Sequence, residues 1–386
     1  MLADRERRIL EQYAQSISYT FAVAVDWDPE DEVLRPSTSV WRKLVELGQV
    51  LTCFFWICLS IWRLGKAASL GSTSQDPMLQ VLYGFMLLVH AGYLVFALGL
   101  SIAKEKAALL YKQLMDMDAG IHEQQEADGE ELEHQATATT PDNSHREKCF
   151  VYAQGLFLAA AMVGTIVTFT TEAFYCWDTT RSVKWAIISG VLAFGTSVQA
   201  TFRFGFISTN LFVYFTTTKW ILMTTTEASG DNIDKGLMQY RSLTVLNSVY
   251  NSTYCSFILP GLKCVMCLLI MFCVLLSTHL RIQLGVGLVM RCLGISAVYM
   301  FIALFLAASM MSGQWQLSKD FIWAFKHQKT DSTTSPLNRK YITACARSMC
   351  PLRIRMAGFY YMEREAKLTL VSFLATGTGN LLIAFK

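Results

Sequence analysis

The sequence predicts an all-α membrane protein with seven transmembrane helices. Of its 386 residues, 53% are hydrophobic and only 16% are charged, and the mean hydropathy is +0.34. This composition excludes an ordinary soluble globular protein. Runs of roughly 20 apolar residues recur along the chain, and each is long enough as a helix to cross about 30 Å of hydrocarbon. Because backbone N–H groups in lipid need partners within the same element, these runs are predicted to be helices.

The order of the spans and their flanking charges predict the orientation. The expected spans are 44–62, 79–101, 150–171, 185–207, 257–278, 285–311 and 367–385. With seven crossings, 24 of the 33 Lys and Arg residues fall on the side of the N-terminus, 6 fall on the other side and 3 lie within spans. Basic residues concentrate on the cytoplasmic side of membrane proteins. We therefore expect a cytoplasmic N-terminus, an extracellular C-terminus and a multi-pass location in the plasma membrane, with membrane lipid as a partner.

The segments between the spans divide the chain into membrane and cytoplasmic parts. We expect a charged, turn-rich cytoplasmic N-terminal arm (1–43), four helices (44–207) interrupted by an acidic, disordered cytoplasmic loop (116–148), a cytoplasmic helical extension (208–256), two helices (257–311), a cytoplasmic helical anchor region (312–366) and a terminal span (367–386). The stretch 208–223 is apolar enough to enter the membrane. The charge distribution instead favours a fourth helix that continues into the cytoplasm.

The cysteines and the ionisable residues do not form the patterns typical of enzymes. Most of the 11 cysteines lie in or beside spans, and only Cys176 falls in an outer loop, so no disulfide framework is predicted. "CVMC" (264–267) has zinc-like spacing but no second pair of ligands. No carboxylate pair or nucleophile–histidine pair lies at a common depth. The chain is therefore expected not to be an enzyme and to need no metal, cofactor or nucleic acid.

The three basic residues inside the predicted spans are Arg203, Lys263 and Arg291. Arg291 is some six residues into the sixth helix, where a charge is costly and calls for a partner or a functional role. Glu172, at the outer end of the third span, is the candidate partner, and snorkelling toward the outer headgroups is the alternative. Lys263 is predicted to snorkel on the cytoplasmic side.

The terminal span carries small and polar residues on one helical face. On a helix, one face would hold Thr369, Ser372, Thr376, Gly379, Asn380 and Ile383. The other faces would hold Leu370, Val371, Phe373, Leu374, Leu381 and Phe385. Small residues allow close helix packing, and hydroxyls can bond between helices. Alternatively, the polar face lines a water-filled pore, which requires several copies around a symmetry axis.

The end of the chain resembles a known family. "RSMCPLRIRMAGFYYMEREAKLTLVSFLATGTGNLLIAFK" (347–386) is similar to the C-terminus of the insect odorant and gustatory receptor superfamily. Those chains share a basic-Pro-Leu-basic stretch, a short cytoplasmic helix that opens with an aromatic residue after glycine, and a final span. The matching positions here are Arg347, Pro351, Leu352, Arg353, Gly358 and Phe359. "YRSLTVLNSVYN" (240–251) also resembles the region before the fifth helix in divergent members. The Thr-Tyr and Gln-Phe signature of gustatory-type members is missing from the last span.

The resemblance implies a tetrameric, ligand-gated, non-selective cation channel, with a coreceptor as an optional partner. Its four last helices would line the pore, chiefly through Thr376, Asn380 and Ile383. An odorant or tastant would bind between the outer halves of the second, third, fourth and sixth helices. The aromatic residues at those positions are Tyr83, Phe85, Phe169, Trp185, Phe194 and Tyr299.

The sequence also bears on other classes of membrane protein. A G-protein-coupled receptor would need the opposite orientation, and its Asp-Arg-Tyr and Asn-Pro-x-x-Tyr motifs are missing from the expected spans. A membrane transporter or an orphan seven-helix scaffold without channel activity is the alternative. A transporter would be expected to show broken spans or central carboxylates.

Overall fold

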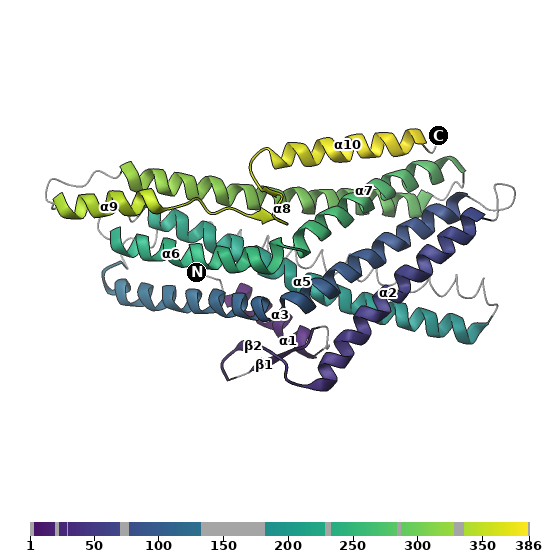
Figure 1. The fold of residues 1–386 in the computed structure, drawn as a ribbon, viewed down its shortest axis with the longest axis horizontal. Coiled ribbons are helices and arrows are strands. Elements are labelled where there is room, and N and C mark those ends of the chain that lie inside the picture. Colours follow the sequence, from purple (N-terminus) through teal and green to yellow (C-terminus); the bar gives the residue numbers. More distant parts are fainter. Residues whose placement is uncertain are drawn as a thin grey trace.

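The computed structural model describes residues 4–19, 23–28, 30–69, 77–132, 182–227, 233–283, 287–327 and 336–384. Long helices run side by side along most of the molecule and give it an elongated shape (Figure 1). The elements are α1 (Asp4–Tyr19), β1 (Val25–Asp28), β2 (Val33–Pro36), α2 (Val40–Ser69), α3 (Pro77–Leu132), α5 (Val183–Glu227), α6 (Ile233–Tyr250), the π-helical turn η2 (Asn251–Cys255), α7 (Ile258–Gln283), α8 (Gly287–His327), α9 (Pro336–Ser348), β3 (Arg355–Met356), β4 (Tyr360–Tyr361) and α10 (Ala366–Ala384).

Six of the described helices are long and apolar enough to cross a membrane. These segments are Val40–Lys66, Tyr83–Met117, Val183–Met223, Ile258–Thr278, Ala297–His327 and Ala366–Ala384. The prediction of an all-α, multi-pass membrane protein is therefore confirmed. The predicted third span, 150–171, lies outside the described residues, so the count of seven spans stays a prediction.

Three helices extend well beyond the predicted spans. α3 continues to Leu132, α5 to Glu227 and α8 to His327, so one end of the bundle consists of helix extensions together with α6 and α9 (Figure 1). The predicted continuation of the fourth span as one helix is confirmed. The prediction of a disordered loop over 116–148 is wrong for 116–132, which is helical in the structure. That stretch contains four Glu, two Gln and two Ala, which favour helix. Residues 133–148 lie outside the described part.

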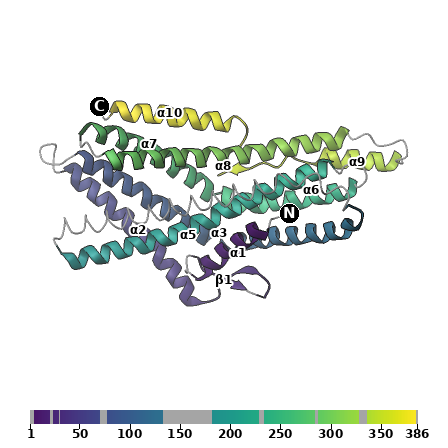
Figure 2. The ribbon, with the colours of Figure 1, turned by 180° about the vertical axis from the view of Figure 1, so that it is seen from behind.

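The N-terminal arm is folded, in contrast to the turn-rich loop that was predicted. β1 and β2 form an antiparallel hairpin that pairs Val25 with Pro36 and Asp28 with Val33. Together with α1, the hairpin packs against α3 and α5, as both ribbon views show (Figure 1, Figure 2). Ile17 and Leu34 belong to the same buried core as α3 and α5, so the arm caps this part of the bundle.

Arg42 ties the arm to the start of α2. Its guanidinium donates to the carbonyl of Ser18 at 3.0 Å and to that of Val25 at 2.6 Å, and it lies 3.0 Å from the carboxylate of Asp26. One side chain thus joins α1, β1 and α2. Contacts of this kind between distant segments leave no local periodicity in the sequence, which explains why the arm was predicted to be a loop.

Glycines determine how closely α3 and α7 approach each other. A Cβ added to Gly99 would lie 2.4 Å from Ile258 Cγ1, and one added to Gly92 would lie 3.1 Å from Val265 Cγ1. A Cβ on Gly84 would lie 3.2 Å from the ring of Phe272, and Gly261 of α7 lies against Val95 in the same way. These pairs follow a single antiparallel register along both helices. Small residues at such positions allow membrane helices to pack by backbone approach.

We predict that Gly99→Ala destabilises the protein by about 1–3 kcal/mol, because the new methyl group overlaps Ile258 in a packed interface. The matched control is Gly195→Ala, since a Cβ at Gly195 would meet nothing within 4 Å. Thermal unfolding in detergent, followed by tryptophan fluorescence, measures both variants. An unfolding temperature of the Gly99 variant at or above that of the control would show that the α3–α7 contact is not close-packed.

Candidate functional site

The terminal helix α10 is docked along a narrow apolar face. Leu370 and Leu374 are buried. Leu381, seven residues after Leu374, packs against the core. Between them, a Cβ added to Gly377 would lie 2.4 Å from Met271 Sδ of α7. Spacings of four, three and four residues place these positions on one side of a helix. Figure 1 shows the consequence: α10 lies at the edge of the bundle, beside α7 and α8.

The predicted polar face of α10 points away from the rest of the chain. Thr369, Ser372, Thr376, Asn380 and Ile383 are all exposed, and Ile383 has an exposed fraction of 75%. The sixth predicted position, Gly379, is half-buried, yet a Cβ there would meet nothing within 4 Å. The structure thus brings the six predicted residues together on the side of α10 opposite its docked face.

The segment that leads into α10, the terminal linker (residues 349–365), is held by hydrogen bonds from several helices. The Tyr240 hydroxyl of α6 donates to the carbonyl of Cys350 at 2.8 Å. The Ser318 hydroxyl of α8 accepts from the N–H of Leu352 at 3.0 Å, and both residues are buried. The linker therefore begins as an integral part of the α6–α8 packing.

The π-helical turn η2 holds the middle of the linker. Asn251 donates through Nδ2 to the carbonyl of Arg353 and accepts through Oδ1 from the N–H of Arg355, both at 2.8 Å. The carbonyl of Cys255 accepts from the N–H of Ala357 at 2.7 Å. A π turn displaces its carbonyls and side chains from the regular helical ladder, which makes such turns frequent at functional positions. Here it pairs the start of α7 with the chain that enters α10.

The linker itself differs from the expectation that the resemblance implied. The sequence "GFYY" was expected to open a short cytoplasmic helix, but residues 355–361 form the β3–β4 hairpin, which pairs Arg355 with Tyr361 and Met356 with Tyr360. Ala357 and Gly358 have φ angles of 50° and 79°. Two successive left-handed residues are typical of a hairpin turn and are incompatible with a right-handed helix at that point.

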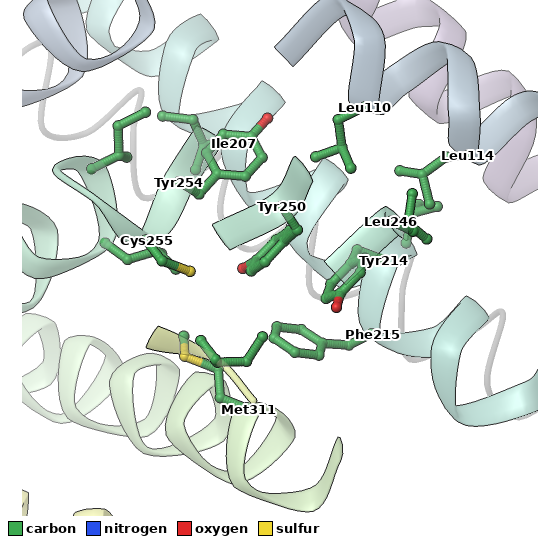
Figure 3. Close-up of a cluster of buried hydrophobic side chains, with 14 of the residues drawn as sticks. Leu110, Leu114, Ile207, Tyr214, Phe215, Leu246, Tyr250, Tyr254, Cys255 and Met311 are labelled. Carbon is green, nitrogen blue, oxygen red and sulfur yellow. The ribbon is translucent and has the colours of Figure 1, made fainter. Parts of the chain in front are cut away.

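A cluster of polar and aromatic side chains from α5, α6 and α8 lies next to the terminal linker. Gln314 of α8 donates to the Tyr214 hydroxyl at 2.6 Å, and Tyr214 donates to Asn247 Oδ1 of α6 at 2.8 Å. The Tyr214 ring stacks on that of Tyr250 with 4.0 Å between centroids. Figure 3 shows these rings in the buried core, with Tyr254 beside them. The cluster joins α5, α6 and α8 at the level of the linker.

The residues predicted to line the ligand pocket are half-buried or exposed where the structure describes them. Tyr83 and Phe85 are half-buried on α3, whereas Trp185 and Phe194 of α5 and Tyr299 of α8 are exposed. Phe169 lies outside the described residues, in the third predicted span. The described part of the chain does not bring the other five into one enclosed cavity, and their assignment as ligand contacts stays a prediction.

The predicted intramembrane pair of Arg291 and Glu172 stays a prediction. Glu172 and the side chain of Arg291 lie outside the described part of the structure. Lys263, predicted to snorkel, donates to the Tyr360 hydroxyl at 2.6 Å. Arg203, a basic residue within the fourth predicted span, is buried and donates to Gln49 Oε1.

An ion pair lies near Arg203. Glu46 of α2, which is buried, pairs with Lys104 of α3 at 3.0 Å. Glu46 falls at the beginning of the first predicted span, where it is easily taken for a flanking charge. The two polar contacts, Glu46–Lys104 and Gln49–Arg203, join α2 to α3 and to α5. An isolated buried charge would cost several kcal/mol, so these partners stabilise each other in place.

Another buried polar group lies between α2 and α3. The His90 ring stacks on Trp56 with 5.5 Å between centroids, and its Nδ1 lies 3.5 Å from the Ser60 hydroxyl. A single histidine in an apolar run is a weak sequence signal, and nothing in the spacing indicated its partners.

The comparisons with solved structures define the fold. This helical bundle is similar to two structures of one insect olfactory receptor. The structure of the olfactory receptor OR5 from Machilis hrabei has a TM-score of 0.58 to this one, at 12% sequence identity over 97% of this chain and 98% of that chain. Its structure in complex with eugenol has a TM-score of 0.59 at 11% identity and covers 98% of both chains. No family model and no curated protein sequence matches the chain. The likeness confirms the fold that the C-terminal motif implied.

Burial of the tyrosines that hold the linker should make stability depend on alkaline pH. Burial raises the pKa of Tyr240, and also those of Tyr250 and Tyr254, above the ordinary value of 10.0. Below that pH these groups are neutral in both the folded and the unfolded chain. Above it the unfolded chain ionises first, so the free energy of unfolding falls as pH rises.

We predict that Tyr240→Phe makes this alkaline loss shallower, because one of the three buried hydroxyls is gone. Thermal unfolding between about pH 8 and pH 11 measures the slope. The matched control is Tyr19→Phe, since Tyr19 is exposed. Equal slopes for the Tyr240 variant and the control would show that Tyr240 ionises freely in the folded protein.

Proposed function

We propose that this chain is a member of the insect odorant and gustatory receptor superfamily. In this proposal it is a subunit of a ligand-gated, non-selective cation channel in the plasma membrane. The observation that carries the proposal is the uncovered face of α10, with Thr369, Ser372, Thr376 and Asn380 exposed in a fold like that of insect olfactory receptors.

The composition of this face suits a wet environment better than lipid. A hydroxyl in hydrocarbon can bond to its own helix, as Thr369 does with the carbonyl of Glu365 at 3.2 Å. The amide of Asn380 has two donors and an acceptor, and leaving these without partners costs several kcal/mol. One helix cannot enclose water. Several copies around a symmetry axis can, and the superfamily's tetramer would supply four.

The pore so formed would discriminate little between cations. Its lining would be Thr376, Asn380 and Ile383, with Thr369, Ser372 and Gly379 along the same face. No formal charge lies among these residues, whereas strongly selective pores use rings of charge or of backbone carbonyls. We infer a pathway that passes small hydrated cations and closes at the apolar ring of Ile383.

Ligand binding would act on the pore through α7. This helix meets α3 through Ile258, Val265 and Phe272 and meets α10 through Met271. Because these contacts are close, a small shift of α3 against α7 would move the surface on which α10 is docked. The OR5 structure solved with eugenol supports a small, lipophilic ligand. Its pocket would include Tyr83, Phe85, Phe169, Trp185, Phe194 and Tyr299.

We predict that cysteine substitution at Thr376 or Asn380 makes the ligand-evoked current sensitive to a charged, water-soluble thiol reagent. A bulky charge attached inside a narrow pore blocks conduction, so the current should fall severalfold during recording. The controls are the unsubstituted chain, which already has 11 cysteines, and Leu374→Cys on the buried face of the same helix.

Two results would count against the pore. Currents that are unchanged at both Thr376→Cys and Asn380→Cys would place the polar face outside the conduction path. Equal block at Leu374→Cys would show that the reagent acts by disrupting the packing of α10 on α7.

A further inference from the structure

The β3–β4 hairpin presents one large apolar side chain at its tip. Phe359 has an exposed fraction of 86%, the highest among the exposed large hydrophobic residues of the described part. It directly follows the left-handed residues Ala357 and Gly358, and its N–H donates to the carbonyl of Met356 at 3.0 Å. The turn therefore directs the ring outward.

The hairpin is firmly held at its base. Met356 and Met362 are buried in the core, and the N–H of Met362 donates to the carbonyl of Ile354 at 2.9 Å. The bond from Ala357 to the carbonyl of Cys255 fixes the turn to η2. The exposure of Phe359 is thus a property of a fixed hairpin, and burying this ring would need something outside the protomer.

Three basic side chains lie at the hairpin, two of them against its aromatic rings. Lys263 Nζ lies 2.6 Å from the Tyr360 hydroxyl and 5.1 Å from the centre of its ring. The guanidinium of Arg353 lies 5.1 Å from the centre of the Tyr361 ring. A guanidinium nitrogen of Arg355 lies 3.5 Å from the position of a Cβ on Gly358.

Among the residues that the structure describes, these three charges have no acidic partner. Within the described residues, the ion pairs involve other side chains, and none joins a carboxylate to Lys263, Arg353 or Arg355. Glu363 and Glu365 follow the hairpin in the sequence, and Arg364 and Lys367 offset them. The surface around Phe359 is therefore basic as well as aromatic.

The hairpin lies where two spans begin. α10 starts at Ala366, five residues after β4, and Lys263 is five residues into α7, whose apolar span starts at Ile258. The hydrogen bond between Lys263 and Tyr360 places both at one level. Aromatic residues with polar tips and basic side chains concentrate at this boundary of a bilayer, where headgroups meet acyl chains.

We propose that the β3–β4 hairpin binds an anionic phospholipid of the cytoplasmic leaflet. The Phe359 ring enters the acyl region, and Lys263, Arg353 and Arg355 contact the phosphate and the acidic headgroup. The choice of leaflet rests on the cytoplasmic N-terminus predicted from the distribution of Lys and Arg, and the link to the pore rests on the proposed function. Because the hairpin leads directly into α10, the bound lipid stabilises the position of the proposed pore helix. Each basic group near a bilayer surface contributes about 1 kcal/mol to the attraction of anionic lipid.

The test uses the full-length chain, purified in detergent and incubated with phosphatidylserine or with phosphatidylcholine. Native mass spectrometry measures the fraction that retains lipid. We expect the unsubstituted chain to prefer phosphatidylserine. Lys263→Gln combined with Arg355→Gln should reduce phosphatidylserine retention roughly tenfold, since each basic group contributes to the attraction. The matched control, Lys112→Gln with Lys219→Gln, removes the same charge at exposed positions on α3 and α5 and should retain the lipid.

Phe359→Ser provides a second, uncharged variant and should also retain less lipid. Equal retention of both lipids by the unsubstituted chain, or equal loss in the Lys263/Arg355 and control variants, would overturn the proposal. So would a Phe359→Ser variant that keeps phosphatidylserine but separates into smaller assemblies, because the hairpin would then contact another copy. Retention is measured without current, so a chain that binds this lipid but conducts no ions would contradict only the proposed channel.

Discussion

The organisation of this molecule depends on how α10 is docked. The helix meets the rest of the chain along one strip, Leu370, Leu374, Gly377 and Leu381, and Gly377 lies against the side chain of Met271 of α7. The glycine leaves room for that side chain, and the opposite face of α10 is turned outward. That face holds hydroxyl and amide groups. The amide of Asn380 would be costly in hydrocarbon, and the protomer leaves this side chain exposed. In the proposed channel, water or other subunits would cover this face.

α7 connects the elements that carry the proposed ligand site and the proposed pore. One side of it is packed against α3 through a glycine-based register, and another side supports α10. Its beginning, the π turn η2, is hydrogen-bonded to the linker that enters α10. α10 is therefore attached to α7 both at its entry and at its middle. A displacement of α7 would be transmitted to the whole terminal helix, which is the behaviour expected of an element between a ligand site and a gate.

The sequence predicted those features that local patterns encode. Apolar runs located the six spans in the described part, and the 3.6-residue period located the polar face of α10, whose six residues the structure does bring to one side. The short hairpins were not predicted. The strand β3 has only two residues, and its turn depends on Ala357 in a left-handed conformation that alanine rarely adopts. Contacts such as Glu46–Lys104 and Arg42–Asp26 join helices and strands whose pairing no local pattern specifies. Over 116–132 the acidic charge suggested disorder. The Glu, Gln and Ala residues of the same stretch favour helix, and helix is what the structure shows there.

The most direct test of the account is an electron cryo-microscopy map of the purified full-length chain in lipid nanodiscs. The account predicts four copies around one axis, with α10 nearest that axis and with Thr376 and Asn380 facing it. A map of a single protomer, or of an assembly in which Thr376 and Asn380 face the acyl chains, would contradict it.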